Sequence, residues 1–117
     1  MIRYGIIGCG SMGREHIENL FAMGGVRVTA LADTHAASRD AALAQCRDTP
    51  QVFEDHRELL ASGLCDAVVI ATPNFTHIDI MRDALAVKGL HILVEKPLVT
   101  RMDDGIELMK RAEGRSG

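Results

Sequence analysis

Short apolar runs alternate with amphipathic stretches along the whole chain, and most of the amphipathic stretches close on a glycine. The apolar or β-branched runs predict strands at residues 6–8, 26–32, 52–53, 67–71 and 90–94. The amphipathic stretches predict helices at residues 11–23, between the second strand and Pro50, at 57–62, at 77–87 and from Thr100 to 113. Thr100 and Asp103 have the spacing of a capping box, which would open the last helix.

This succession of elements indicates the fold class. Continuous hydrophobic strands, each followed by a helix, are typical of a parallel sheet that is covered by helices on both faces. The order of elements therefore predicts a doubly wound α/β domain, Rossmann-like, with about five strands. No repeat, low-complexity segment or linker divides the sequence, so residues 1–117 are expected to form a single domain.

Composition excludes several other classes of protein. Hydrophobic residues are 47% and charged residues 25% of the 117 residues, which excludes disorder. The longest apolar run, at residues 67–71, is far shorter than the ~20 residues of a membrane span, and residues 1–5 do not resemble a signal peptide. The net charge of −3 argues against nucleic-acid or anionic-membrane partners, and three scattered cysteines suit a reducing compartment. We therefore expect a cytoplasmic protein.

A glycine-rich turn follows the first predicted strand. Residues 8–13 read GCGSMG, the pattern G-x-G-x-x-G, where that strand turns into the first helix. In a dinucleotide site Gly8 allows the tight turn, Gly10 lets the backbone approach a pyrophosphate, and Gly13 lets the helix pack closely on the strand. The helix N-terminus also offers N–H groups and a partial positive charge to phosphates. The glycines are a weak pattern alone, but the strand–turn–helix context predicts dinucleotide binding.

An acidic residue completes the pattern. Asp33 ends the second predicted strand, 20 residues after Gly13, where an acid accepts hydrogen bonds from the adenosine ribose hydroxyls. In the alternative interpretation Asp33 or Thr34 only caps the next helix. The carboxylate would repel the 2′-phosphate of NADP, no Arg stands at 34 or 35, and Arg39 is a helical turn away. NAD is therefore favoured over NADP as the cofactor.

Polar residues also follow the fourth and fifth predicted strands, at residues 71–77 (ATPNFTH) and 94–98 (VEKPL). Ligands in open α/β sheets bind at the carboxyl ends of strands. In a simpler interpretation the first segment is a helix cap and the second is a strand that ends in solvated charges. Flavin and S-adenosylmethionine proteins also use glycine-rich turns, but neither class explains these two segments.

Taken together, these residues resemble the NAD-binding N-terminal domain of the glucose–fructose oxidoreductase / inositol dehydrogenase (Gfo/Idh/MocA) family. The resemblance covers the whole chain and rests on residues 5–10 with His16 and on residues 71–74 with His77. Its most specific element is the E-K-P sequence at Glu95, Lys96 and Pro97.

The resemblance implies an oxidoreductase that transfers hydride between a nicotinamide cofactor and a CH–OH or C=O carbon of a sugar, cyclitol or related polyol. It implies that Thr72, Asn74 and His77 line the nicotinamide side of the site and that Glu95 faces the nicotinamide ribose. Lys96 would be the catalytic residue at the reacting carbon's oxygen. No His, Cys and Asp cluster has metal-ligand spacing, so no metal is expected. The expected cofactor-binding residues are Gly8, Gly10, Ser11, Met12, Gly13, Asp33, Ala71, Thr72, Asn74, His77, Glu95 and Lys96.

Members of that family are much longer than this chain, and their second domain typically forms the floor of the substrate site. The sequence ends at residues 114–117, where the family pattern would begin a sixth strand, and this would leave the fifth strand as an apolar edge. We therefore expect the N-terminal part of a longer, homo-oligomeric two-domain protein, inactive by itself because the C-terminal substrate domain is absent. The alternative is a non-catalytic NAD(H)-binding sensor or regulatory module.

Overall fold

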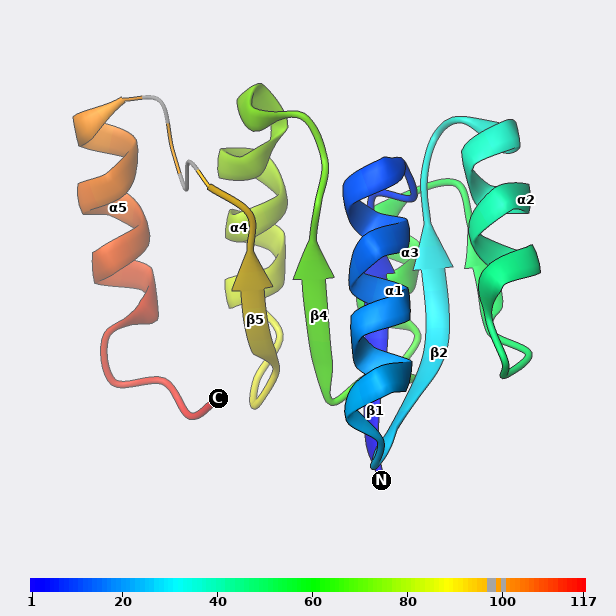
Figure 1. Cartoon of the computed structure of the whole chain (residues 1–117). Helices are drawn as coiled ribbons and strands as arrows, with labels where there is room; N and C mark the ends of the chain where they lie inside the picture. Colours follow the sequence, from blue (N-terminus) through cyan, green and yellow to red (C-terminus); the bar gives the residue numbers. More distant parts are fainter. Residues whose placement is uncertain (97–98, 100) are drawn as a thin grey trace.

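The computed structural model describes residues 1–96, 99 and 101–117. Their strands form one parallel sheet in the order β3-β2-β1-β4-β5 (Figure 1). The strands are β1 (Ile2–Ile7), β2 (Val26–Ala32), β3 (Gln51–Phe53), β4 (Ala67–Ile70) and β5 (His91–Val94). The helices are α1 (Ser11–Met23), α2 (Ala36–Gln45), α3 (His56–Ala61), α4 (His77–Leu85) and α5 (Met102–Ala112), with a short 3₁₀ helix η1 (Asn74–Thr76) before α4. The doubly wound α/β prediction is confirmed.

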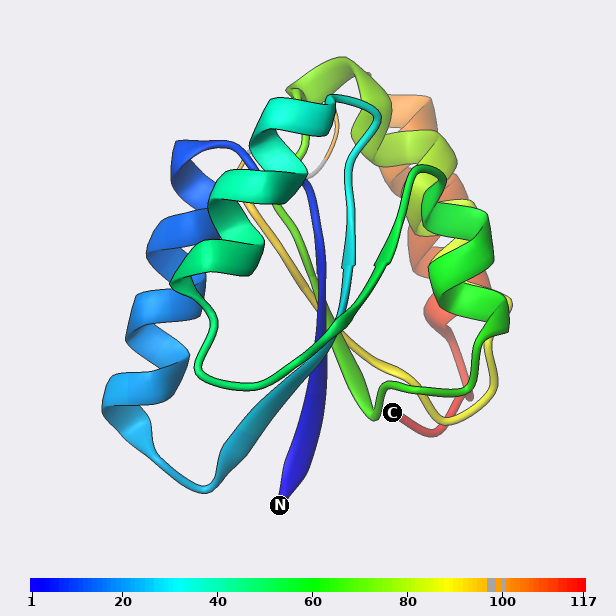
Figure 2. The same cartoon turned by 90° about the vertical axis from the view of Figure 1, so that its right-hand side faces the viewer.

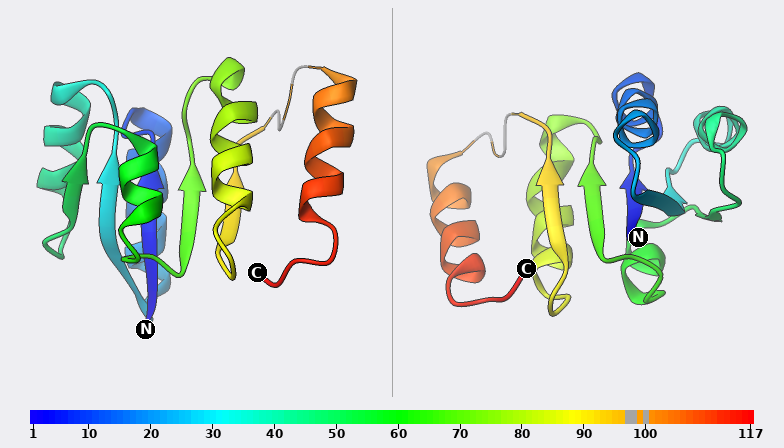
Figure 3. Two further views of the ribbon diagram at one scale, coloured as in Figure 1. Left: turned by 180° about the vertical axis from the view of Figure 1, so that it is seen from behind. Right: turned by 60° about the horizontal axis from the view of Figure 1, so that its bottom comes forward.

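Helices cover both faces of this sheet. Figure 2 shows α1 and α2 on one side of the strands and α3, α4 and α5 on the other. From behind, α3 and α4 lie in front of the sheet and α5 stands beside its β5 edge (Figure 3). The strand order reverses direction at β1. The chain adds β2 and β3 on one side of β1 and then returns to add β4 and β5 on the other side of β1. This reversal opens a crevice above the carboxyl ends of β1 and β4, where ligands of such sheets bind.

The core is aliphatic and is divided by the sheet into two layers. Ile6, Ile17 and Val69 belong to the layer beneath α1 and α2, whereas Ile7 and Ile70 belong to the layer beneath α3, α4 and α5. Alternate residues of a strand face opposite sides, so the neighbours Val69 and Ile70 enter different layers. All four residues of β4 are buried, as the uninterrupted apolar run predicted.

The edges of some elements differ from the prediction. The first strand begins at Ile2. The 3₁₀ helix η1 intervenes before α4, and the Thr76 hydroxyl stabilises this turn by donating to the Pro73 carbonyl at 2.6 Å. The residue preceding α5 is Arg101, whose guanidinium contacts Asp103 at 3.3 Å, and no side-chain cap forms there. Thr100, the expected capping residue, lies outside the described residues.

The strand β5 forms one edge of the sheet, as expected from the sequence. It pairs with β4 alone among the described strands. Leu93 lies on the same face of the sheet as α1 and α2, but these helices do not cover it and its side chain is exposed. Ile92 and Val94 point the other way and pack against the layer beneath α4 and α5. No helix of the described residues has the length and apolar character needed to cross a bilayer.

Candidate functional site

The turn between β1 and α1 requires glycine at two positions for reasons of packing. Gly8 has a φ of +100°, and a Cβ there would lie 2.6 Å from the backbone carbonyl of Ala71. A Cβ on Gly13 would lie 1.8 Å from the carbonyl oxygen of Gly8, so the first turn of α1 rests directly on the glycine turn. Both positions therefore admit no larger residue without displacing the backbone of the turn.

Gly10 differs from these two glycines. Its backbone is extended, with a φ of −71° and a ψ of −167°, and a Cβ built there meets no described atom within 4 Å. The Cα of Gly10 instead faces a cavity. Protein packing therefore does not require glycine here, and the open space is available to a ligand that approaches the backbone.

The same turn opens the N-terminus of α1. Gly10 is the residue before the helix and supplies no capping side chain, and the first helical hydrogen bond runs from the Arg14 N–H to the Gly10 carbonyl at 2.9 Å. The N–H groups of Ser11, Met12 and Gly13 precede this bond, as the first N–H groups of a helix always do. Together with the helix dipole they form a site for an anionic group beside the Gly10 Cα.

Asp33 lies at the end of β2 and braces this turn. Its carboxylate accepts the Cys9 N–H at 2.7 Å through one oxygen and the His35 N–H at 2.8 Å through the other. The residue that precedes α2 is His35, so neither Asp33 nor Thr34 is the N-cap, although Asp33 does hold the backbone where α2 begins. A carboxylate oxygen can accept more than one hydrogen bond, so Asp33 can still accept from a ribose hydroxyl.

Arg39 lies nearer to this corner than its sequence position indicated. Its side chain, 16% exposed, folds back from α2 so that Nη1 donates to the Asp33 carbonyl at 2.8 Å. Nη2 lies 3.7 Å from the carboxylate of Glu54. Sequence spacing alone placed Arg39 a helical turn away, and the long side chain spans that distance. Its charge is thus directed to a backbone carbonyl and to Glu54.

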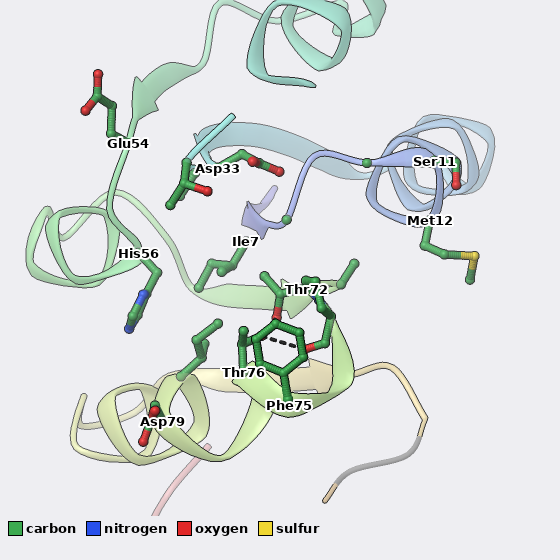
Figure 4. Close-up of a pocket in the computed structure, with 17 residues that line it drawn as sticks. Ile7, Ser11, Met12, Asp33, Glu54, His56, Thr72, Phe75, Thr76 and Asp79 are labelled. Atoms are coloured by element: carbon green, nitrogen blue, oxygen red, sulfur yellow. Dashed lines mark hydrogen bonds between the residues drawn. The ribbon is translucent and has the colours of Figure 1, made fainter. Parts of the chain in front are cut away.

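A cavity of about 840 Å³ lies above the carboxyl ends of the first four strands. Figure 4 shows Asp33 on one side of Ile7, with Thr72 and Phe75 on the other. Asp33, Glu54 and Asp79 contribute carboxylates, and none of the described lining residues is Lys or Arg. The lining residues are Ile7, Gly8, Gly10, Ser11, Met12, Ala32, Asp33, Thr34, Glu54, His56, Ala71, Thr72, Pro73, Phe75, Thr76, Asp79 and Ile80.

Seven of the residues expected to bind a cofactor line this cavity: Gly8, Gly10, Ser11, Met12, Asp33, Ala71 and Thr72. Sequence reasoning missed the wall that β3 and α3 supply through Glu54 and His56, because their contribution depends on strand order. It also missed Phe75, which is 78% exposed at the rim. The signal available in the sequence was an aromatic residue within the polar segment 71–77.

The end of β4 is organised by hydrogen bonds around Thr72. The Ala71 N–H donates to the Ile7 carbonyl at 2.8 Å, and the hydroxyls of Thr72 and Thr76 are hydrogen-bonded to each other at 2.7 Å. His77 is fully buried, and its Nε2 contacts the Thr72 carbonyl at 2.9 Å. The structure therefore places His77 beneath the cavity, where it supports Thr72. Asn74 is exposed in η1 outside the cavity wall.

The end of β5 carries Glu95 and Lys96, and neither lines this cavity. The Glu95 N–H donates to the Ile70 carbonyl at 3.0 Å, which fixes its backbone beside the end of β4. The Glu95 carboxylate contacts His16 Nε2 of α1. Lys96 is exposed, and Pro97, the last residue of the E-K-P sequence, lies outside the described residues.

Other reactive groups in the described residues are few. Burial, with a smaller contribution from Asp33, raises the pKa of the Cys9 thiol to about 12, so this buried cysteine stays protonated and is no nucleophile at neutral pH. No group of three or more His, Cys, Asp or Glu side chains among the described residues is arranged to hold a metal ion. The site therefore consists of a glycine turn, a helix N-terminus and the polar ends of four strands.

A glycine turn between β1 and α1, a carboxylate at the end of β2 and a cavity across these strand ends define a dinucleotide-binding Rossmann domain. The chain belongs to the Gfo/Idh/MocA oxidoreductase family with an NAD-binding Rossmann fold, whose family model matches residues 2–117.

Two curated relatives resemble the chain over most of its length. It is 38% identical over 95 residues to the rhizopine catabolism protein MocA of Rhizobium meliloti, covering 81% of this chain and 29% of the relative. It is 36% identical over 110 residues to inositol 2-dehydrogenase of Pseudarthrobacter chlorophenolicus, covering 93% and 32% respectively. The chain thus spans about a third of the length of the curated relatives it matches.

Solved structures give the same result. The myo-inositol dehydrogenase of Lactobacillus casei, crystallised with NAD(H) and myo-inositol, matches with a TM-score of 0.89 and 28% identity over 95% of this chain and 33% of that one. The WlbA dehydrogenase of Bordetella pertussis, crystallised with NADH and UDP-GlcNAcA, matches with a TM-score of 0.86 and 32% identity over 96% and 34%. These matches do not support the alternative of a non-catalytic sensor.

Proposed function

We propose that the chain is the NAD(H)-binding part of an oxidoreductase that acts on a CH–OH or C=O carbon of a sugar, cyclitol or related polyol. The observation that carries the proposal is the open space at the Gly10 Cα, beside the N-terminus of α1 and within the cavity that Asp33 and Thr72 also line. The relatives that are inositol or UDP-sugar dehydrogenases support the substrate class.

The residues present fit a dinucleotide. The N–H groups at the start of α1 suit the pyrophosphate, and the free space at Gly10 lets it approach them. Asp33 suits the adenosine ribose hydroxyls. Thr72 and Asn74 follow β4 and Glu95 follows β5, and the ends of these two strands would hold the nicotinamide half. When bound, the nicotinamide ring supplies the two-electron acceptor or donor of the reaction.

Lys96 is the residue that this chain would contribute to the chemistry. Its exposed ammonium follows β5 at the carboxyl edge of the sheet. There Nζ can exchange a proton with the substrate hydroxyl and stabilise negative charge on the substrate oxygen. The hydrogen bond from the Glu95 N–H to the Ile70 carbonyl fixes the backbone of the residue that precedes Lys96.

The carboxylates of the cavity favour NAD over NADP. Asp33 would face an added 2′-phosphate, Glu54 adds a second carboxylate to the cavity wall, and none of the described lining residues is Lys or Arg. Arg39 is close, but its guanidinium is engaged with the Asp33 carbonyl and lies near Glu54.

A second candidate function is NAD-dependent glycoside hydrolysis. The chain is 36% identical over 120 residues to a glycosyl hydrolase family 109 protein of Streptomyces niveus, covering 97% of this chain and 24% of the relative. Some glycosidases depend on NAD. A dehydrogenase accumulates reduced cofactor with its substrate, whereas a glycosidase releases a sugar without net change in the cofactor.

Two measurements test the proposed function. Calorimetric titration of the chain with NADH should show one binding site, which Gly10→Val abolishes while the variant keeps its fold. The complete gene product, assayed with NAD on inositols, UDP-sugars and aryl glycosides, should reduce NAD with a polyol or sugar. Lys96→Ala should abolish that turnover, whereas Lys88→Ala, an exposed lysine in the turn before β5, should leave it unchanged. Undiminished NADH binding by Gly10→Val would contradict the assignment of the glycine turn.

A further inference from the structure

One polar contact joins the two halves of the site. His16 on α1 and Glu95 after β5, 79 positions apart in the sequence, are paired through Nε2 of the imidazole and Oε1 of the carboxylate. Their side chains are only 22% and 27% exposed, so solvent screens the contact incompletely. The pair links the helix that begins at the glycine turn with the segment that carries Lys96.

Both partners are held by the fold. His16 stands on α1 next to Ile17, and Gly13, Ile17 and Leu20 of that helix are buried against the sheet. Glu95 is fixed through its N–H bond to the Ile70 carbonyl, at the end of β4. On the face of the sheet that α1 covers, β5 presents the exposed His91 and Leu93, and the Glu95 side chain lies beyond them at the carboxyl end. The His16–Glu95 pair therefore makes the polar connection between α1 and the β5 end.

We propose that His16 is a positioning residue for the nicotinamide half of the site. By holding the Glu95 carboxylate, it sets the position of the segment of Glu95 and Lys96 relative to the N-terminus of α1, where the pyrophosphate would lie. The inference rests on the proposed function, because it concerns the same dinucleotide. His16 itself lines no part of the cavity and acts through Glu95.

A positioning role and a merely structural role differ in which ligand they affect. ADP contains the adenosine and pyrophosphate groups but lacks both nicotinamide and its ribose, so it needs the glycine turn and Asp33 but not the β5 end. A change that displaces Glu95 and Lys96 should weaken NADH and spare ADP. A change that disturbs α1 as a whole should weaken both ligands alike.

The experiment compares both ligands by calorimetry on the parent chain and on His16→Leu, with His91→Leu as the matched control at the opposite end of β5. We expect His16→Leu to weaken NADH about tenfold, the effect of losing one hydrogen bond to a charged group, and to weaken ADP by less than about twofold. His16→Gln, whose amide can still donate to Glu95, should recover most of the NADH affinity. The control should bind both ligands as the parent does.

The outcomes separate the two proposals. Equal weakening of NADH and ADP by His16→Leu, or no weakening of either, would overturn the positioning role while leaving the dinucleotide site intact. A parent chain that binds neither ligand would overturn the proposed function itself, and this inference with it. If His16→Leu loses its folded circular dichroism spectrum, His16→Asn, too short to reach Glu95, takes its place in the same comparison.

Discussion

The three glycines between β1 and α1 meet three different surroundings. Gly8 needs its positive φ and lies against the Ala71 backbone, Gly13 lies against the Gly8 carbonyl, and Gly10 faces the open cavity. The first two serve the fold, because a Cβ there would collide with backbone that cannot move aside. A Cβ on Gly10 would collide only with a bound group, as the proposed dinucleotide site requires.

This difference gives the first prediction. Gly13→Ala should destabilise the chain by about 2–3 kcal/mol, the cost of forcing extra atoms into tightly packed backbone. Gly10→Ala should change the free energy of unfolding by less than about 0.5 kcal/mol, as substitutions without a steric conflict do. Urea unfolding of the two variants measures both values. Similar destabilisation by the two substitutions would contradict the packing difference described for these glycines.

Asp33 has a structural role as well as the proposed one in binding. Asp33→Asn removes the negative charge but nearly preserves the shape, so the repulsion of a 2′-phosphate falls. We expect the ratio of NADP affinity to NAD affinity to rise about tenfold. The variant should also lose some stability, because the Cys9 and His35 N–H groups bond to different carboxylate oxygens, and in Asn one of these is replaced by an NH2 group that cannot accept. Competitive titration with the two cofactors measures the ratio, and an unchanged ratio would remove the specificity role of Asp33.

At the scale of elements, ion pairs secure the outer helices. Glu107 of α5 accepts from Arg82 of α4 at 2.6 Å and from Arg111 of its own helix at 2.8 Å. The hydrogen bond from Arg82 is the main reason why the pKa of Glu107 falls from 4.5 to about 2. A carboxylate whose pKa is lower in the folded than in the unfolded chain stabilises the fold above the unfolded pKa, and this stabilisation is lost as the pH falls toward the folded value.

The pH dependence of stability should therefore change when Glu107 is neutralised. Between pH 6 and pH 3 the parent should lose more of its free energy of unfolding than Glu107→Gln, which lacks the titrating carboxylate. Urea unfolding at the two pH values measures this loss. Glu18→Gln, an exposed acid on α1, serves as the control and should follow the parent. An identical loss in the parent and Glu107→Gln would show that the contact between α4 and α5 does not depend on this charge.

At the scale of the whole molecule, the cavity and the proposed catalytic residue are separated in space. The cavity lies over β1 to β4, while Lys96 follows β5 and is exposed outside the described cavity wall. A substrate beside Lys96 would be neither oriented nor shielded from water by the described residues. Orientation and the exclusion of water each contribute substantially to enzymatic rates.

The 117-residue chain by itself should therefore bind NADH and show no measurable dehydrogenase turnover. The measurement is a spectrophotometric assay with NAD on the same panel of inositols and UDP-sugars that is used for the complete gene product. Binding without turnover is the expected result. Turnover by the chain alone would show that the open edge beside Lys96 is a sufficient active site.

Local patterns in the sequence determined the class of fold and much of the proposed site. The alternation of apolar strands and amphipathic helices predicts the elements, and the spacing of Gly8, Gly10, Gly13 and Asp33 predicts their meeting at one edge. These features depend on residues that are close in sequence or at a regular period. A strand's burial and a turn's backbone conformation follow from such short-range chemistry.

Contacts between distant residues were decided by the tertiary structure alone. Strand order brings Glu54 and His56 into the cavity wall, and the turn at η1 sends His77 beneath Thr72 instead of into the cavity. The pairing of His16 with Glu95 likewise exists only once α1 lies against the sheet beside the end of β5. No periodicity encodes these contacts, because they depend on where whole strands and helices are placed and on how far each side chain reaches.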